Sequence, residues 1–308
     1  MGTRVFLTGA SGYLGGVLAE HLARMPEVER VTGVDLMTPA AWFPETIRCV
    51  PLDIRSPDLV SLMAGHDVVV HTAGVVLWPA SMPARVRDDI NLNGLINVAR
   101  AALKQRVRRF IHASSMAVYD PHLARGQSGV AEDFPRGSKD PSLYYWSSKA
   151  IAEERLTAAL AGSDTVLTLL RPIYIVGLRN RATIEGMRAN AVNFPGRNPR
   201  RQFVHEDDVA DAFVRAIRDD LPGPYNVVPD DHLRMREVWR MMGVKGVPTL
   251  PVSVARMVTA IRWRCFGSPI HASWVADMLV DFTGSNARLK TTGWRPRHGS
   301  AEALRSAL

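Results

Sequence analysis

Short apolar runs alternate with helical patterns along the first two thirds of the chain. The runs occupy residues 5–9 (VFLTG), 31–35 (VTGVD), 67–74 (DVVVHTAG), 109–115 (RFIHASS) and 165–172 (TVLTLLRP). Apolar residues recur between them at intervals of three and four, as on one face of a helix, in GGVLAEHLARM, NLNGLINVARAALKQR and LYYWSSKAIAEERLTAAL. This repeating strand–helix unit predicts a parallel sheet with helices on both faces.

The rhythm breaks after Arg171. A stretch rich in Gly, Asn, Pro and Arg runs to Arg201, and EDDVADAFVRAIRD then predicts an amphipathic helix with an acidic first turn. From about Pro229, short helices and loops rich in Pro and Trp are expected. We therefore expect an α/β fold, a Rossmann-type doubly wound parallel sheet with a smaller C-terminal substrate domain. The predicted NAD-binding domain is 1–172, completed by about 203–228, and the substrate-binding domain is 173–202 with 229–308.

Composition and cysteine content narrow the class of protein. The chain has 308 residues, of which 46% are hydrophobic and 22% charged, as is typical of globular proteins. Its two cysteines, Cys49 and Cys265, form no CxxC motif and no cluster at metal-ligand spacing. The sequence predicts no disulfide framework and no metal site, and it favours a cytoplasmic location.

The net charge of +8 raises the question of nucleic-acid or membrane binding. The arginines are spread along the whole chain without interleaved aromatic residues, so we expect anionic small molecules and no nucleic acid. The apolar region 244–266 is interrupted by Lys245 and by three arginines, too many charges for a membrane span. Its part RMVTAIRWRCF fits either a basic amphipathic surface helix or an ordinary packed helix. We favour the packed helix and expect no membrane partner.

Three glycines stand between the first predicted strand and the first predicted helix. In TGASGYLG, Gly9 suits a tight turn, Gly12 lets the backbone approach a pyrophosphate, and Gly15 lets helix and strand pack closely. A pyrophosphate then lies at the helix N-terminus, where backbone N–H groups point toward it. This motif predicts dinucleotide binding.

Two acidic residues follow later strands and suit the adenosine half of a dinucleotide. Asp35 ends the next strand, where a carboxylate accepts hydrogen bonds from the ribose hydroxyls and repels a 2′-phosphate, which favours NAD over NADP. The alternative is a strand-terminal Asp that caps a turn. Asp53, with Ile54, follows a third short strand and suits either the adenine amino group or a turn.

Tyr145 and Lys149 carry the candidate chemistry. They lie four residues apart in a helical pattern and so share one face. A nearby ammonium favours the phenolate, which predicts a lowered tyrosine pKa and proton exchange near neutral pH. Ser115 follows a predicted strand at the sheet edge where ligands of parallel sheets bind, and can hydrogen-bond the same substrate oxygen.

With these residues in place, the chain resembles the extended short-chain dehydrogenase/reductase family, also called the NAD-dependent epimerase/dehydratase family. The resemblance spans nearly the whole length. It is carried by TGASGYLG, Asp35, LDI at 52–54, HTAG at 71–74, NLNGLINV at 91–98, SSMAVY at 114–119, YWSSK at 145–149, RPIYIVG at 171–177, RQFVHEDDVADA at 201–212, PYNVV at 224–228 and RLKTTGWRPR at 288–297.

The resemblance implies a Rossmann domain that binds NAD and a catalytic set of Ser115, Tyr145 and Lys149. In that set Tyr145 is the general acid/base, Ser115 positions the substrate oxygen, and Lys149 lowers the tyrosine pKa and holds the nicotinamide ribose. The implied cofactor-binding residues are Gly9, Ser11, Gly12, Tyr13, Leu14, Gly15, Asp35, Asp53, Ile54, Thr72, Ala73, Gly74, Asn91, Tyr145, Lys149 and Pro172. A helix N-cap is the alternative role for Asn91.

Departures from the family pattern narrow the reaction. Family dehydratases carry Thr and two acidic residues where this chain has Ser115, Met116 and Ala117, so dehydration is disfavoured. RPIYIVG has Tyr174 where sugar-nucleotide epimerases have Asn, and only 29 residues separate Arg171 from Arg201, so a full sugar nucleotide fits poorly. The candidate substrate contacts are Met116, Tyr174 and Arg201, and Trp78 also suits a less polar substrate. A solvated charge run is the alternative for Arg201, and core packing is the alternative for the other three residues.

The leading hypothesis is an NAD-dependent oxidoreductase that acts on a secondary alcohol or the matching ketone. An epimerase, in which the hydride returns to the opposite face, is the alternative, and a catalytically idle dinucleotide sensor is a third possibility. The expected partner is a small-molecule substrate. The resemblance also implies a homodimer through the helices that begin near Asp88 and Tyr144.

Overall fold

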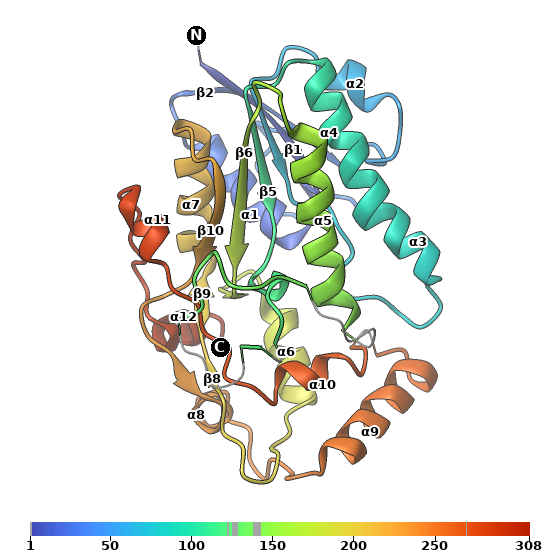
Figure 1. The fold of residues 1–308 in the computed structure, drawn as a ribbon, viewed down its shortest axis with the longest axis vertical. Coiled ribbons are helices and arrows are strands. Elements are labelled where there is room, and N and C mark those ends of the chain that lie inside the picture. The colour runs from blue at the N-terminus through green and yellow to red at the C-terminus, as the bar shows by residue number, and fades with distance from the viewer. Residues whose placement is uncertain (1, 122, 125–128, 138–142, 269) are drawn as a thin grey trace.

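A seven-stranded sheet forms the centre of the computed structural model, which describes residues 2–121, 123–124, 129–137, 143–268 and 270–308. The strand order is β10-β6-β5-β4-β1-β2-β3, and every neighbouring pair is parallel (Figure 1). The strands are β1 (Thr3–Thr8), β2 (Val28–Asp35), β3 (Arg48–Pro51), β4 (Val68–His71), β5 (Arg109–Ala113), β6 (Val166–Pro172) and β10 (Gly223–Val227). The predicted doubly wound α/β sheet is confirmed.

Helices cover both faces of this sheet because its strands are apolar on both sides. On one face Val5 and Leu7 pack in the same core as α1 (Tyr13–Ala23) and α7 (Glu206–Arg218). On the other face Phe6 belongs to a second core with α2 (Leu59–Leu62), α4 (Leu95–Lys104) and α5 (Tyr144–Leu160) (Figure 1). Because all neighbouring strands are parallel, the seven strands end at one shared edge, and this edge faces the C-terminal elements (Figure 1).

The helix before β5 starts earlier than the sequence pattern indicated. α3 (Ala84–Asp88) runs directly into a π-helical segment, η1 (Asp89–Gly94), and then into α4. π-Helical turns inside longer helices are frequent at functional sites. The expected start near Asp88 is thus inside a continuous helical stretch.

The remaining elements lie beyond the carboxyl edge of the sheet or flank it. They are the 3₁₀ turn η2 (Met116–Val118), β7 (Tyr174–Val176), α6 (Arg181–Ala189), β8 (Arg200–Arg201), β9 (Phe203–His205), β11 (Leu233–Arg234), α8 (Met235–Met241), α9 (Val252–Cys265), α10 (Trp274–Asp277), α11 (Ala287–Thr291) and α12 (Ser300–Ser306). A separate apolar cluster that includes Val176, Phe203 and Trp239 packs many of them together. β7 pairs with β9 in parallel, and β8 pairs with β11 in antiparallel orientation.

α9 departs from the expectation of an ordinary packed helix. Ala255 is its one buried residue, and Met257, Val258 and Ile261 are exposed by 55%, 40% and 46%. The helix lies at the periphery of the molecule, so most of its surface has no other element to pack against (Figure 1). No helix in the described part of the chain is long and apolar enough to cross a membrane.

A buried ion pair fastens α5 to the sheet. Arg171 of β6 donates through Nε to Glu153 Oε1 at 2.9 Å and through Nη2 to Oε2 at 2.6 Å. Ser114 Oγ also donates to Glu153 Oε1, at 2.6 Å, and Arg171 Nη1 donates to the Tyr119 hydroxyl at 2.7 Å. Glu153 is fully buried, so its two oxygens compensate the buried guanidinium inside the protein.

Buried polar side chains form a row across the central strands beneath α5. Thr8, His71 and His112 are register partners on β1, β4 and β5. Thr8 Oγ1 and His71 Nδ1 share a 2.7 Å hydrogen bond, and the two imidazole rings stack with centroids 5.4 Å apart. Among the described residues, neither ring nitrogen of His112 has a hydrogen-bond partner. Burial, helped by the charge of Lys149, lowers the pKa of His71 to about 3 and that of His112 well below its usual range.

Glu153→Gln should destabilise the fold strongly. Removing this carboxylate leaves the Arg171 guanidinium buried without its counter-charge, which costs about 3–5 kcal/mol of unfolding free energy. Glu154→Gln, an exposed position one residue along α5, is the matched control and should change stability by less than about 0.5 kcal/mol. Urea denaturation of both variants measures this, and equal stabilities would contradict the role given to the pair.

The two buried histidines should make the protein sensitive to acid. Below a pH of about 6.5 the unfolded chain binds protons at these positions and the native protein does not, so stability is complete above that pH and falls as the pH drops toward 3.

His112→Phe removes one of these groups without removing a hydrogen bond to a described residue. Its unfolding free energy should therefore fall less steeply between about pH 7 and pH 5 than that of the wild type. His232→Phe, at an exposed histidine, should leave the wild-type slope. Parallel slopes for wild type and His112→Phe would show that His112 titrates normally in the native state.

Candidate active site

The glycine turn connects β1 to α1 as the motif requires. Gly9 has a φ of 72°, and a Cβ on it would lie 2.6 Å from the backbone nitrogen of Ala73. A Cβ on Gly15 would lie 2.0 Å from the Gly9 carbonyl oxygen, so only glycine lets α1 start this close to β1. Gly12 precedes α1, and its N–H donates to that same carbonyl at 3.1 Å. The three glycines let β1, the segment after β4 and the start of α1 pack this closely, and we call this turn the glycine cradle because its shape fits a dinucleotide.

Asp35 lies beside this turn at the end of β2. Its Oδ2 accepts a hydrogen bond from the Ser11 backbone N–H at 3.0 Å, and its Oδ1 accepts one from Met37 at the same distance. Of the other motif residues, Tyr13 donates its hydroxyl to buried Glu206 at 2.7 Å, and Leu14 packs partly buried against the core. The structure therefore brings Ser11 and Asp35 together and directs Tyr13 toward α7.

The segment after β4 closes the other side of the turn. Thr72 Oγ1 donates to the Thr8 carbonyl at 2.8 Å, and the Ala73 backbone is the neighbour that Gly9 accommodates. Asn91 holds the next residue, Val75, by accepting from its N–H at 2.7 Å and donating to its carbonyl at 3.0 Å. A Cβ on Gly74 would lie 3.3 Å from the Asn91 oxygen. Asn91 lies inside η1, so the alternative of a helix N-cap is wrong.

Asp53 is paired within its own loop. Its Oδ1 accepts from the backbone N–H and Nε of Arg55 at 2.8 and 3.0 Å, and its Oδ2 accepts from Nη2 at 2.6 Å. Hydrogen bonding to Arg55 lowers the pKa of Asp53. Ile54 is buried and fills the space beside Gly94 of η1. These contacts give Asp53 and Ile54 structural roles in the loop after β3.

The structure brings Ser115, Tyr145 and Lys149 together at the carboxyl edge of the sheet. Ser115 follows β5, and its Oγ accepts a hydrogen bond from the Ala117 N–H at 3.1 Å. Ser115 also lies close enough to Tyr145 to favour the charged form of its hydroxyl. Lys149 Nζ donates to the Ala113 carbonyl at 3.2 Å and lies 5.9 Å from the centre of the Tyr145 ring.

The two titratable groups of this set are shifted in opposite directions. Burial raises the pKa of Tyr145, and the neighbouring Ser115 side chain opposes this only in part. Burial lowers the pKa of Lys149 to about 8, opposed by the charge of Glu153. The expected lowering of the tyrosine pKa is therefore absent in the chain by itself, because loss of solvation outweighs the neighbouring groups.

Aromatic rings that the sequence did not single out surround the tyrosine. The Trp274 ring of α10 lies 5.1 Å from the Tyr145 ring, and the Trp146 ring lies 5.9 Å from it at nearly a right angle. Trp146 was visible only as a neighbour in YYWSSK. Trp274 had no sequence signal, because its proximity depends on how the C-terminal segment folds back.

A second aromatic group lies next to Tyr145. The guanidinium of Arg87 is 3.2 Å from the centre of the Tyr144 ring and 4.3 Å from that of Trp78. His271 stacks on Trp78 with ring centroids 5.7 Å apart. Of these, only Trp78 was a sequence candidate, and it is buried.

The other substrate candidates contribute to the packing of the C-terminal elements. Met116 is buried against the position of Gly284, and Tyr174 donates its hydroxyl to Asp277 at the end of α10. Arg201 is buried and donates to backbone carbonyls, including that of Arg200 at 2.8 Å. Burial raises the pKa of Asp277 to about 7. Asp277 is a further residue of this region that the sequence did not indicate.

Pro172, the last predicted cofactor contact, is the last residue of β6 and lies at the same carboxyl edge. Among the described residues there is no group of three or more side chains that could hold a metal ion.

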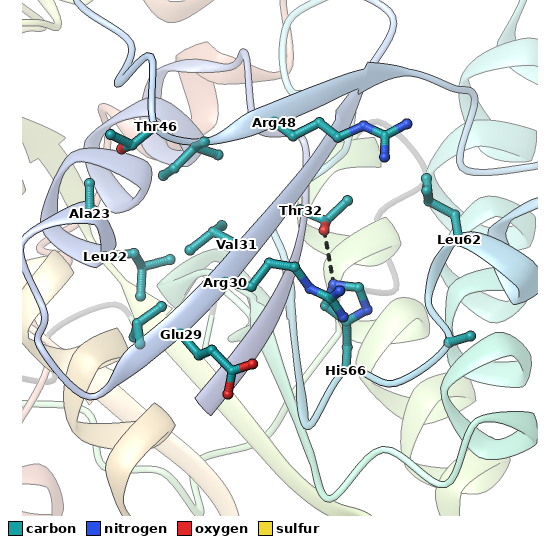
Figure 2. A pocket seen from close by; sticks show the side chains of 13 residues that line it. Leu22, Ala23, Glu29, Arg30, Val31, Thr32, Thr46, Arg48, Leu62 and His66 are labelled. Carbon is teal, nitrogen blue, oxygen red and sulfur yellow. Dashed lines mark hydrogen bonds between the residues drawn. The ribbon is translucent and has the colours of Figure 1, made fainter. Parts of the chain in front are cut away.

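A hollow of about 350 Å³ lies at the opposite end of the strands (Figure 2). The first half of β2 and the start of β3 line it, together with His66, whose Nε2 shares a 2.9 Å hydrogen bond with Thr32 Oγ1. Because ligands of parallel sheets bind at the carboxyl ends of the strands, this hollow is separate from the candidate active site.

Comparison with known proteins places this geometry in a family. The model of the NAD dependent epimerase/dehydratase family matches residues 5–227. The chain is 26% identical over 286 residues to a decarboxylating sterol-4-alpha-carboxylate 3-dehydrogenase of Candida albicans, covering 82% of this chain and 79% of that protein. It is 31% identical over 187 residues to an N-acetyl-alpha-D-glucosaminyl-diphospho-ditrans,octacis-undecaprenol 4-epimerase of Escherichia coli, covering 60% and 52%.

A solved structure shares the fold over the full length. It is a Thermus thermophilus UDP-glucose 4-epimerase in complex with NAD, with a TM-score of 0.75, 23% identity, and coverage of 99% of this chain and 97% of that chain. Together with the family match, the glycine cradle and the position of Asp35 show that the chain belongs to the NAD dependent epimerase/dehydratase family and is an NAD-dependent enzyme of oxidoreductase or epimerase type.

Proposed function

We propose that this protein oxidises a secondary alcohol, or reduces the matching ketone, with Ser115, Tyr145 and Lys149 as the catalytic residues. One observation carries the proposal: Ser115, Tyr145 and partly buried Lys149, one helical turn along α5 from the tyrosine, lie together at the sheet edge that also holds the glycine cradle.

The cofactor fits the cradle by its charge and shape. The Gly9–Gly12–Gly15 turn would hold the pyrophosphate, and Asp35 would accept hydrogen bonds from the adenosine ribose. We assign the segment 72–74 and Asn91 to the same site because they form its other wall. Bound NAD supplies the hydride acceptor and, once reduced, the hydride donor.

The residues of the chain move and hold the proton. Tyr145 takes the proton from the substrate hydroxyl during oxidation and returns it during reduction, and Ser115 orients the same oxygen. Because burial raises the pKa of Tyr145, its phenolate needs a positive charge nearby. Lys149 provides that charge below a pH of about 8, where its ammonium form dominates.

The walls around Tyr145 favour a substrate with an apolar body. Trp274 and Trp146 face the catalytic ring, and the segments 173–202 and 229–308 supply the substrate side in this proposal. The sterol dehydrogenase relative, by its name, acts on a lipid alcohol. Dehydration is disfavoured because the residues after Ser115 are Met116 and Ala117, both apolar and buried.

Epimerisation is the second candidate, supported by the relative named as an undecaprenol-linked sugar 4-epimerase. The same residues would then move the proton out and back, and NAD, if bound, would accept the hydride and supply it to the opposite face, with no net change in the cofactor. Accumulation of NADH with substrate supports the dehydrogenase, and interconversion of two epimers without NADH supports the epimerase.

Assembly and location are further parts of the proposal. α4 and α5 lie side by side on one face of the sheet, and we place a homodimer contact on their outer sides (Figure 1). Both cysteines are free and Cys265 is exposed, which suits a reducing cytoplasm.

Tyr145→Phe should abolish turnover and leave cofactor binding intact. General acid–base catalysis contributes about 100- to 10,000-fold, so kcat should fall by about that factor while calorimetry gives the wild-type Kd for NAD. Sterols and other secondary alcohols are the first substrates to screen by NADH formation. Tyr225→Phe, in the outermost strand β10, is the control and should keep full activity. A Tyr145→Phe enzyme with normal turnover would refute the proposed role.

Asp35→Asn should weaken NAD and relax the preference against NADP. A hydrogen bond to a charged group contributes about 1.5–3 kcal/mol, which corresponds to a loss of about tenfold or more in NAD affinity. Exposed Asp58→Asn is the matched control, with unchanged affinity for both cofactors. Calorimetric titration with NAD and NADP measures this, and an unaltered NAD Kd would show that Asp35 only caps the turn.

A further inference from the structure

α9 presents an apolar stripe to solvent. Met257, Val258 and Ile261 are 55%, 40% and 46% exposed, and Phe266, just after the helix, is 77% exposed. At 100° per residue the first three lie within about 100° of one another, and Met257 and Ile261 point away from buried Ala255. Scattered exposed apolar residues are ordinary, but a continuous stripe on a peripheral helix marks an interaction surface (Figure 1).

The charge around this stripe is entirely positive in the sequence. No acidic residue occurs between Glu237 and Asp277, and the same stretch contains Arg240, Lys245, Arg256, Arg262 and Arg264. Arg256 and Arg264 are exposed on α9 itself. An apolar stripe flanked by arginines matches an anionic lipid surface, where the apolar side chains enter the headgroup boundary and the arginines meet the phosphates.

The inner side of α9 is fixed to the neighbourhood of the candidate active site. Trp263 Nε1 donates to the Trp78 carbonyl at 3.0 Å, and Trp78 packs edge-on against Tyr144, the residue before Tyr145, with ring centroids 5.2 Å apart. The residues just before Trp78, Val76 and Leu77, are also exposed, by 41% and 48%. These contacts tie the inner side of α9 to the segment beside Tyr145 and leave its outer side facing away from the protein.

We propose that α9 docks this protein on the surface of an anionic lipid bilayer, without spanning it. The apolar side chains of the stripe then contact the headgroup and upper acyl region of the bilayer. Under the proposed function, the docked face lies next to the aromatic walls around Tyr145, so a lipophilic alcohol would enter from the membrane side. The docking itself does not depend on the activity.

The test is flotation of the full-length protein with vesicles of phosphatidylcholine alone and of phosphatidylcholine with phosphatidylglycerol. The expected result is binding to the anionic vesicles that weakens at high salt, because screening shortens the reach of the arginines. Tyr145→Phe should bind vesicles as the wild type does, so failure of docking and failure of the proposed chemistry give different results.

Two double variants separate the apolar and the charged contributions. Ile261→Ser with Phe266→Ser should reduce vesicle binding by about tenfold or more, because two apolar side chains are lost from the interface. Arg256→Gln with Arg264→Gln should reduce it by about 30-fold, at about 1 kcal/mol per arginine near an anionic surface. All positions are exposed, so thermal unfolding should be unchanged.

Matched controls use exposed positions away from α9. Leu178→Ser with Leu308→Ser, and Arg155→Gln with Arg305→Gln, should bind vesicles like the wild type. No binding to anionic vesicles, or equal losses in the control variants, overturns the proposal. So does a change of oligomeric state in the Ile261→Ser with Phe266→Ser variant without lipid, since the stripe would then contact a second copy of the chain.

Discussion

The pairing of Glu153 with Arg171 inside the protein is the interaction on which the candidate site depends most. Glu153 lies one turn beyond Lys149 on α5, and Arg171 lies near the end of β6. The pair fixes the helix against the sheet at the height of the strand ends. A shift of α5 along the sheet would separate the two side chains and leave each charge unpaired in the apolar interior, which is energetically costly. Tyr145 and Lys149 therefore project over the edge where the glycine turn lies.

The floor of the site is polar as well, although the strands around it are apolar. His71 and His112 lie beneath Lys149, remain neutral because burial lowers their pKa, and so add no positive charge to that of the lysine. The Ala113 carbonyl accepts a hydrogen bond from the Lys149 ammonium. Burial lowers the pKa of Lys149 to about 8 and raises the pKa of Tyr145, so the tyrosine phenolate needs a positive charge nearby. The pKa values of Tyr145 and Lys149 therefore depend on the whole assembled site and not on the spacing of the two residues alone.

The C-terminal elements pack against the candidate site. α10 brings Trp274 against the Tyr145 ring and Asp277 against Tyr174, and the buried Arg201 donates to the carbonyl of Asp277 at the end of the same helix. α9, which precedes α10 in the chain, leaves its apolar stripe exposed at the periphery. If the two proposals hold, the aromatic rings around Tyr145 and the basic, apolar surface of α9 suit a substrate that is itself lipophilic.

The sequence by itself determined the parallel sheet, the glycine turn, Asp35 and the approximate positions of Ser115, Tyr145 and Lys149, because each rests on local spacing or on the shared direction of strand ends. It did not determine that Asp53 pairs with Arg55 or that Asn91 hydrogen-bonds the backbone of Val75. A polar side chain has several possible partners, and the folded structure decides which of them lies within reach. The sequence also did not show that Trp274 and Asp277 lie at the site, or that the outer side of α9 is exposed to solvent. Those outcomes depend on contacts between residues far apart in the chain, and burial, which sets the pKa of Tyr145 and Lys149, exists only once the elements have packed.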